Sequence, residues 1–436
     1  MSTTTKNNIV PIVIIGGLFA IFGFVTWING ALIPFMKTIN ELTEAQSYLV
    51  ATASYISFVV MALPASYIIN KVGYKNGISL GLAVMAVGAL VFIPAADART
   101  YWLFLVAIFI QGIGMTICQT AANPYITILG PIESGAKRMA MMGIANKVAG
   151  ALGSVIFGAL LLSGIDEVNE KLGSVSADEK SVLLDAMADS VHTPYIVMAV
   201  VLFIFAFLIR KANLPNVEAT VENEVTTGVA TSKSIFQYPQ LWLGVIALFV
   251  YVGAEVIAGD TIIAYGISLG IPATEAKFFT TYTLMAMVAT YALGVFLIPK
   301  YLSQKTALIG SAVLGIIFSF LILSTSGFTS VLFVAALGIS NALVWPAIWP
   351  LTLDGLGKHT KTASALLIMA ISGGAIIPPL YGRMVDANKH ELIASGLQEA
   401  DALSTASTSS YWILIPCYII ILFFALWGHK IKSWSK

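Results

Sequence analysis

Long apolar runs, separated by short polar or charged breaks, fill most of the chain. Each run approaches or exceeds the roughly 20 residues that a helix needs to cross the hydrocarbon core of a bilayer. The first run is too long for the apolar part of a signal peptide and lacks a convincing cleavage site, so we count it as a helix. The pattern predicts twelve transmembrane helices, at residues 9–36, 48–70, 77–95, 101–129, 139–163, 193–210, 240–268, 278–299, 306–325, 330–356, 362–382 and 408–429.

The composition supports a protein built for the membrane. The chain of 436 residues is 58% hydrophobic and only 10% charged, whereas a soluble domain is about 25% charged. Its formal net charge of +1 gives no electrostatic basis for binding nucleic acid. The phosphate-binding motif G-x-x-x-x-G-K-[ST] is absent from the sequence, which argues against an ATP-driven pump. We therefore expect an all-α protein in a lipid bilayer that is not an enzyme and carries no cofactor.

The helices fall into two groups of six. A six-helix half at 1–210 is followed by a polar linker at 211–239 and a second half at 240–436. Of the 23 Lys and Arg residues, 15 lie on the side of the predicted N-terminus, 7 lie on the other side, and Lys147 lies within a helix. Because positive charge accumulates in cytoplasmic loops, both termini are expected in the cytoplasm.

Two features repeat between the halves. The loops at 165–192 and 384–407, each before the last helix of its half, contain amphipathic segments that predict short surface helices. The segments 124–158 and 346–382 each combine a proline-bearing helix end, a short basic loop and a glycine-rich helix. Parallel six-helix repeats with a site between them are the architecture of major facilitator transporters. The alternative is that two unrelated helices are both rich in glycine.

Polar side chains inside the predicted helices are costly in hydrocarbon, so each marks a candidate site. On the fourth helix, Thr116, Gln119 and Asn123 share one face, and amides both donate and accept hydrogen bonds, as sugar hydroxyls require. On the tenth helix, indole rings one turn apart offer flat surfaces to the C–H face of a sugar. The alternatives are interhelical hydrogen bonds and an interfacial aromatic belt. The candidate substrate-binding residues are Trp27, Asn29, Gln119, Asn123, Asn146, Asn341, Trp345 and Trp349.

Ionisable residues inside the helices suggest a coupling ion. A buried carboxylate must pair, bind a cation or hold a proton. Glu255 lies closest to the middle of its helix, and we expect it to bind the coupling ion. Na⁺ is favoured over H⁺, and Asn29, Gln119 or backbone carbonyls would be the further ligands of a sodium ion. Lys147 either extends to the inner surface or pairs with a carboxylate. The candidate ion-coupling residues are Glu255, Asn29, Lys147 and Asp260, with no metal site other than the sodium candidate at Glu255.

Three segments resemble the fucose permease and glucose/galactose transporter family of the major facilitator superfamily. They are QTAANPYITILGP with GAKRM shortly after it, YVGAEV at 251–256, and WPAIWPLTLDGLGKHTKTASALLIMAISGGAIIPPLYG at 345–382. The resemblance covers nearly the whole chain and implies a major facilitator fold and monosaccharide import. It implies that Trp345 corresponds to an aromatic residue facing the sugar and Asn146 to an amide on the fifth helix. The fucose permease has acidic residues at the positions of Gly30 and Gln119, and this chain lacks both. The retained Glu255 therefore favours the glucose/galactose branch of the family. For some members of that branch, the resemblance implies sodium coupling.

These observations predict a secondary transporter that imports a glucose- or galactose-type hexose across a bacterial inner membrane by alternating access. Symport with Na⁺ is favoured over symport with H⁺. The alternative within the fold is an N-acetylglucosamine or fucose permease with proton coupling, while a drug exporter would have a wider and more apolar cavity. The alternative from another class is a sugar sensor that does not transport. We expect a monomer, with a monosaccharide and a coupling cation as its partners.

Overall fold

The computed structural model describes residues 9–128, 135–172, 174–212, 234–298, 300–356 and 359–434, which form helices joined by short connections. The first half contains α1 (Ile9–Trp27), α2 (Asn29–Ile39), α3 (Glu44–Ser47), α4 (Leu49–Val72), α5 (Tyr74–Asp97), α6 (Tyr101–Ile128), α7 (Gly135–Leu161), α8 (Ile165–Leu172), α9 (Ala177–Asp189) and α10 (His192–Lys211). The second half contains α12 (Pro239–Val256), η3 (Ile257–Thr261), α13 (Ile262–Ser268), α14 (Ala273–Ala276), α15 (Phe279–Leu297), α16 (Gln304–Ser324), α17 (Gly327–Ala342), α18 (Val344–Leu353), α19 (Thr360–Met369), α20 (Gly373–Ala394), α21 (Glu399–Ser410) and α22 (Leu414–Leu426).

Twelve helical segments of the described residues are long and apolar enough to cross a membrane, which confirms the predicted number. Three of them, Ala177–Lys211, Thr362–Ala394 and Glu399–Lys430, extend furthest past the predicted spans. The short helices expected in the two long loops are present as α8, α9 and α21. The prediction of a loop from 384 is wrong, because α20 continues without a break to Ala394. Neither Gly nor Pro interrupts that stretch, and it ends just before Gly396, whose φ is +100°.

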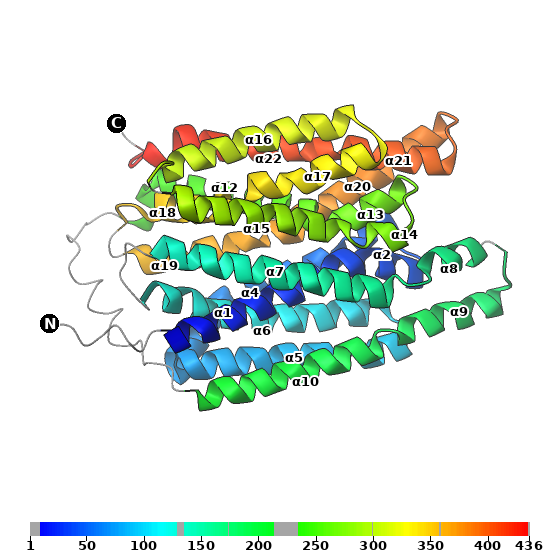
Figure 1. Cartoon of the computed structure of the whole chain (residues 1–436), viewed down its shortest axis with the longest axis horizontal. Helices are drawn as coiled ribbons and strands as arrows, with labels where there is room; N and C mark the ends of the chain where they lie inside the picture. The colour runs from blue at the N-terminus through cyan, green and yellow to red at the C-terminus, as the bar shows by residue number, and fades with distance from the viewer. Residues whose placement is uncertain are drawn as a thin grey trace.

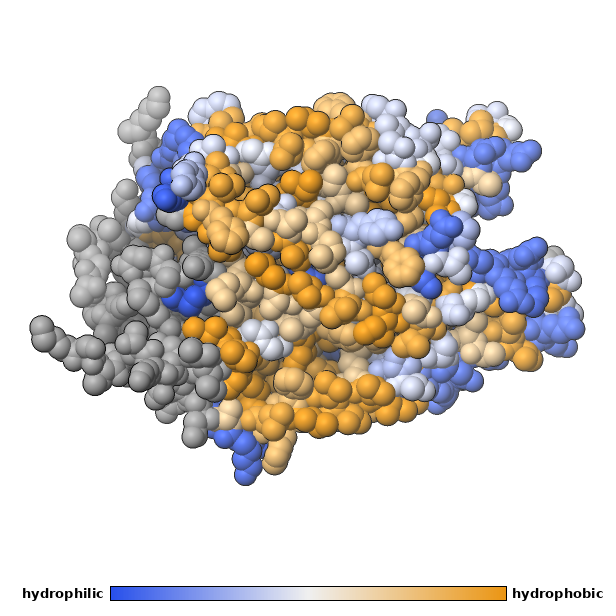
Figure 2. Space-filling view, in the orientation of Figure 1, coloured by the Kyte–Doolittle hydropathy of each residue, from blue (hydrophilic) through white to orange (hydrophobic). Residues whose placement is uncertain are grey.

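The helices form two groups that lie side by side (Figure 1). The start of α1 and the end of α22 lie at one end of the bundle, and α8, α9 and α21 project at the other (Figure 1). The sides of the bundle between these ends are largely apolar, and blue hydrophilic residues gather at the α8/α21 end (Figure 2). This apolar belt is what contact with lipid requires. The cytoplasmic placement of the termini and the domain boundaries stay predictions, and residues 213–233 of the linker lie outside the described part of the chain.

The tenth and seventh spans are among those whose helices are interrupted along their length. The tenth span breaks between α17 and α18, because Pro346 has no N–H to donate to the carbonyl of Ala342. The seventh span contains the π-helical turn η3, a feature often found at functional sites. The wider turn exposes backbone carbonyls, and neighbouring threonines satisfy them: Thr280 Oγ1 donates to the carbonyl of Gly259 at 2.7 Å. Both interruptions therefore place irregular backbone inside protein, where it is tolerated.

At the α8/α21 end, two matching contacts hold the halves together. Asp386 of α20 accepts hydrogen bonds from the first two backbone N–H groups of α3, at 3.1 and 2.9 Å. Asp166 of α8 accepts from the first two N–H groups of α14, at 3.0 and 3.4 Å. Each carboxylate lies in one half and each helix start in the other. Because the first N–H groups of a helix lack internal partners and carry partial positive charge, a carboxylate there is stabilising.

Glycines allow the close approach at both contacts. A Cβ on Gly382 would lie 2.9 Å from Cα of Ala45 in α3. A Cβ on Gly158 would lie 3.0 Å from Cβ of Lys277, which follows α14. These two glycines end the repeated segments that the sequence indicated. The repeat therefore builds the same contact twice, once on each side of the bundle.

Candidate functional site

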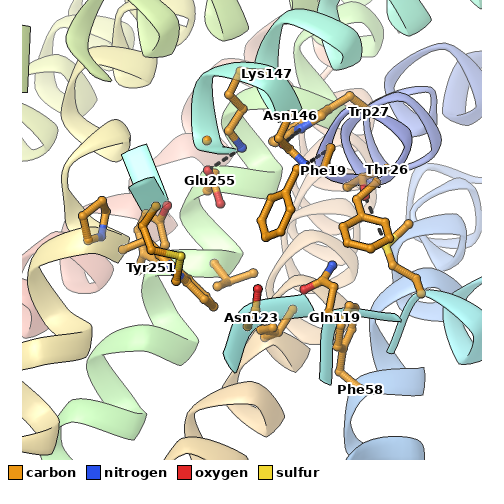
Figure 3. Close-up of a pocket in the computed structure, with 18 of the residues that line it drawn as sticks. Phe19, Thr26, Trp27, Phe58, Gln119, Asn123, Asn146, Lys147, Tyr251 and Glu255 are labelled. Carbon is orange, nitrogen blue, oxygen red and sulfur yellow. Dashed lines mark hydrogen bonds and ion pairs between the residues drawn. The ribbon is translucent and has the colours of Figure 1, made fainter. Parts of the chain in front are cut away.

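A cavity of about 160 Å³ lies between the two halves. It is smaller than the roughly 300–1,000 Å³ of sites for drug-sized ligands, so it suits a single small molecule. Eight aromatic residues line it, among them Phe19, Tyr251 and Trp345. Its polar side chains come from α1, α6, α7 and α12 (Figure 3), and they are Thr26, Gln119, Asn123, Asn146, Lys147 and Glu255.

Amide groups form one part of the wall. Gln119 and Asn123, one turn apart near the end of α6, lie together on the same side of the cavity (Figure 3). Asn146 of α7 is held from two sides: its Oδ1 accepts from Trp27 Nε1 at 3.3 Å, and its Nδ2 donates to the carbonyl of Phe19 at 3.2 Å. The cavity therefore presents both donors and acceptors, as expected from the fourth-helix pattern.

Trp345 supplies an aromatic surface from the broken tenth span. It lines the cavity together with Pro346, and its contact with a sugar stays a prediction. Trp349 is absent from the lining and packs behind it, with the ring centroids 5.3 Å apart. One tryptophan of the pair therefore faces the cavity and the other supports it.

Trp27 is held tightly between the halves. Its side chain is buried, and Lys147 Nζ lies 4.1 Å from the ring centroid, a cation–π contact. A Cβ on Gly150 of α7 would lie 2.4 Å from the indole, and a Cβ on Gly259 of η3 would lie 2.1 Å from it. Only glycine leaves room for the indole at these two positions. Hydropathy carries no signal for this packing.

Lys147 and Glu255 form an ion pair across the halves. Lys147 Nζ donates to Glu255 Oε1 at 2.9 Å, and both side chains are largely buried, with 8% and 13% exposure (Figure 3). Of the two interpretations of Lys147, pairing with a carboxylate is therefore the one observed. The sodium site expected at Glu255 does not fit this arrangement, because the ammonium group already occupies the carboxylate.

Several candidates lie outside the cavity lining. Asn29 Nδ2 donates to Ser54 Oγ at 3.1 Å, and Asn341 Oδ1 accepts from the Tyr418 hydroxyl at 2.8 Å, so both amides make interhelical hydrogen bonds. Thr116 Oγ1 donates to a carbonyl of its own helix at 2.8 Å. Asp260 is fully buried one and a half turns beyond Glu255. Helical spacing put Thr116 on the face of Gln119, but it lies deeper than the cavity reaches.

Other features of the site escaped the sequence pattern. The aromatic residues Phe19, Tyr55, Phe58 and Tyr291 line the cavity, and nothing distinguishes them from other apolar residues in apolar helices. Gly30, where the resemblance implied a lost acid, is closely packed: a Cβ there would lie 2.5 Å from Thr280 Oγ1. The side chains of 124–137, which include most of the first signature, lie outside the described residues.

The structure has twelve spans in two six-helix halves, with a small polar cavity between the halves and irregular helices around it. This arrangement defines a secondary transporter of the membrane. The family model of the Major Facilitator Superfamily matches residues 15–379, and the chain belongs to that superfamily. This confirms the predicted fold class.

Individual relatives agree with this assignment. The chain is 32% identical to the glucose/galactose transporter of Brucella abortus biovar 1 (strain 9-941) over 416 residues, which cover 95% of this chain and 92% of that protein. It is 29% identical to the L-fucose-proton symporter of Escherichia coli (strain K12), over 88% of each chain. The crystal structure of the transporter FucP in the outward conformation matches with a TM-score of 0.70 and 26% identity, over 99% of this chain and 100% of that one. These relatives are transporters and not enzymes, and the predicted family resemblance is confirmed.

Proposed function

We propose that this protein imports a monosaccharide, of the glucose or galactose type, across a bacterial inner membrane. The observation that carries the proposal is the cavity: its size suits one small molecule, and it combines the amides of Gln119, Asn123 and Asn146 with the indole of Trp345. Amides match the hydroxyls of a sugar, and an aromatic ring matches its C–H face. The name of the Brucella relative supports the choice of hexose. Transport would proceed by the two halves rocking around the cavity as a monomer.

We further propose that import is coupled to protons. Two observations favour H⁺ over the Na⁺ that the sequence suggested. The Lys147 ammonium lies 2.9 Å from Glu255 Oε1, and the resulting ion pair has no net negative charge to attract a sodium ion. The matching relative from Escherichia coli is named a proton symporter. An N-acetylglucosamine or fucose permease with the same coupling is the alternative within the fold.

Counterflow tests the proposed substrate. The purified protein is reconstituted in liposomes that are preloaded with an unlabelled sugar. Labelled glucose, galactose, N-acetylglucosamine or fucose is then added to the outside medium. We expect transient accumulation of labelled glucose or galactose, and none in liposomes without protein. Accumulation of only N-acetylglucosamine or fucose would move the assignment within the family. Binding of a sugar without exchange would identify a sensor, and the absence of both would exclude the proposal.

A further inference from the structure

The seventh span holds a carboxyl group that the cavity does not use. Asp260 lies in η3 at 0% exposure, and its carboxylate oxygens accept no hydrogen bond of normal geometry among the described residues. The neutral amide of Asn29 lies close enough to act on Asp260, but its Nδ2 donates to Ser54 Oγ at 3.1 Å. The nearby hydroxyls are engaged elsewhere: Thr280 donates to the carbonyl of Gly259 at 2.7 Å, and Thr283 donates to that of Ala258 at 2.9 Å. An ionised carboxylate is strongly disfavoured in such a place, whereas a protonated one is not.

The charges around Asp260 do not balance when it is ionised. Lys147 and Glu255, which form the ion pair, both act on it electrostatically, and the Tyr55 phenol also lies within electrostatic reach. The amide of Asn29 on α2 faces it and is neutral, as are the threonines of α15. No further charged group acts on Asp260 in the described part of the chain. One ammonium therefore balances one of two carboxylates, and the cluster lacks one positive charge.

The position of Asp260 fits a gated site. Glu255 lies on the cavity wall (Figure 3), while Asp260 lies one and a half turns further along the span toward the α8/α21 end. Beyond it, the halves are closed by the contacts of Asp166 and Asp386. In this conformation the carboxyl group is shielded from the cavity and from that end of the bundle. Separation of the halves at the α8/α21 end would uncover it.

We propose that Asp260 is the proton-binding site that couples transport to the proton gradient. This inference rests on the proposed function. With the α8/α21 end open, one carboxylate oxygen of Asp260 bonds a proton from the outer water, and the O–H stays intact as that end closes. When the proton leaves to water on the inner side, Glu255 and Asp260 are both ionised and share the single positive charge of Lys147. The cluster then carries one excess negative charge, which favours the binding of the next proton. One proton crosses with each sugar molecule.

A proton suits this site better than a sodium ion does. Sodium needs a shell of several oxygen ligands and the space to hold it. The cavity lining of the described residues does not reach Asp260, and the surrounding threonine hydroxyls point their hydrogens at backbone carbonyls. A proton needs only the carboxylate oxygen itself. Sodium is therefore an outcome that the experiment must distinguish.

The test uses purified full-length protein in liposomes with the sugar that the wild type exchanges. Three quantities are measured: counterflow, accumulation driven by an imposed pH gradient, and the alkalinisation of a lightly buffered medium during sugar entry. The wild type is expected to move one proton per sugar without sodium. Asp260→Asn is expected to retain counterflow and to lose both accumulation and alkalinisation, and Asp260→Glu is expected to recover them. The matched control is Asp178→Asn on the exposed start of α9, which leaves all three unchanged.

Each other result overturns the inference. Accumulation by Asp260→Asn against the sugar gradient would show that another group carries the proton. Loss of counterflow in a folded Asp260→Asn would show a packing or substrate role. If that variant does not fold, the wild type still decides, because sodium-dependent uptake with no pH change excludes a proton site. Failure of the wild type to exchange any sugar would instead overturn the proposed function.

Discussion

Removing the charge of Asp386 or Asp166 is expected to loosen the closed α8/α21 end. Each carboxylate joins one half to a helix start of the other by two hydrogen bonds of 2.9 to 3.4 Å. An asparagine keeps one acceptor oxygen and loses the charge. Hydrogen bonds to charged groups contribute about 1.5–3 kcal/mol and neutral ones about 0.5–1.5 kcal/mol. Both aspartates are half-buried, and solvent screening lowers the difference to about 0.5–1.5 kcal/mol per site.

That energy predicts a measurable change in the population with this end open. One substitution should raise the open fraction roughly 2- to 12-fold, since 1.4 kcal/mol is a factor of ten. The two contacts share no residue, so their effects should add, to roughly 5- to 140-fold for the double variant. Because a Glu399→Gln substitution removes an ion pair with Lys389 inside one half, it serves as the control and should change little.

Cysteine labelling reports the open fraction. Thr52 Oγ1 donates to the carbonyl of Ala375 at 2.7 Å across the halves, and Thr52 is half-buried, so a Thr52→Cys probe should react more slowly while this end is closed. The native cysteines Cys118 and Cys417 are buried, and the protein without the Thr52→Cys substitution gives the background labelling rate. A maleimide that cannot cross membranes is added to intact cells, and the labelling rate is compared between variants. Rates within twofold of the control, in folded protein, would refute the idea that these carboxylates hold the end closed.

Three further predictions concern the cavity and its supports. Trp345→Ala should weaken sugar binding by about 1–3 kcal/mol, roughly ten- to hundredfold, in equilibrium binding to purified protein; unchanged binding would remove the tenth span from the site. Gly259→Ala should lower the melting temperature and transport, because its Cβ would lie 2.1 Å from an indole, whereas Gly310→Ala, with open space around it, should not. Lys147→Met should destabilise the protein by up to about 3 kcal/mol, because it leaves the Glu255 carboxylate buried without its partner. Adding Glu255→Gln removes that charge and should recover much of the loss. Equal melting temperatures for the single and double variants would contradict this prediction.

The sequence alone determined the number of spans, their division into two halves and part of the cavity wall. Bilayer thickness fixes the length of a spanning helix, so an apolar run is read locally, without knowledge of its neighbours. Helical periodicity is also local, and it put Gln119 and Asn123 on one face, which the structure turns toward the cavity. The proline-interrupted tenth span likewise marked Trp345.

The tertiary structure decided which polar residues act together. Lys147 and Glu255 are 108 residues apart and lie in different halves, so no local pattern could choose between pairing and a sodium site. Glu255 was expected to lie closest to the middle of its helix, yet Asp260 is the more deeply buried, and its carboxylate oxygens accept no hydrogen bond of normal geometry among the described residues. The close packing of Gly259 against Trp27 is equally invisible in either segment alone. The reason is physical: the cost of a charge in the membrane depends on the groups that surround it, and only the docking of the two halves brings those groups together.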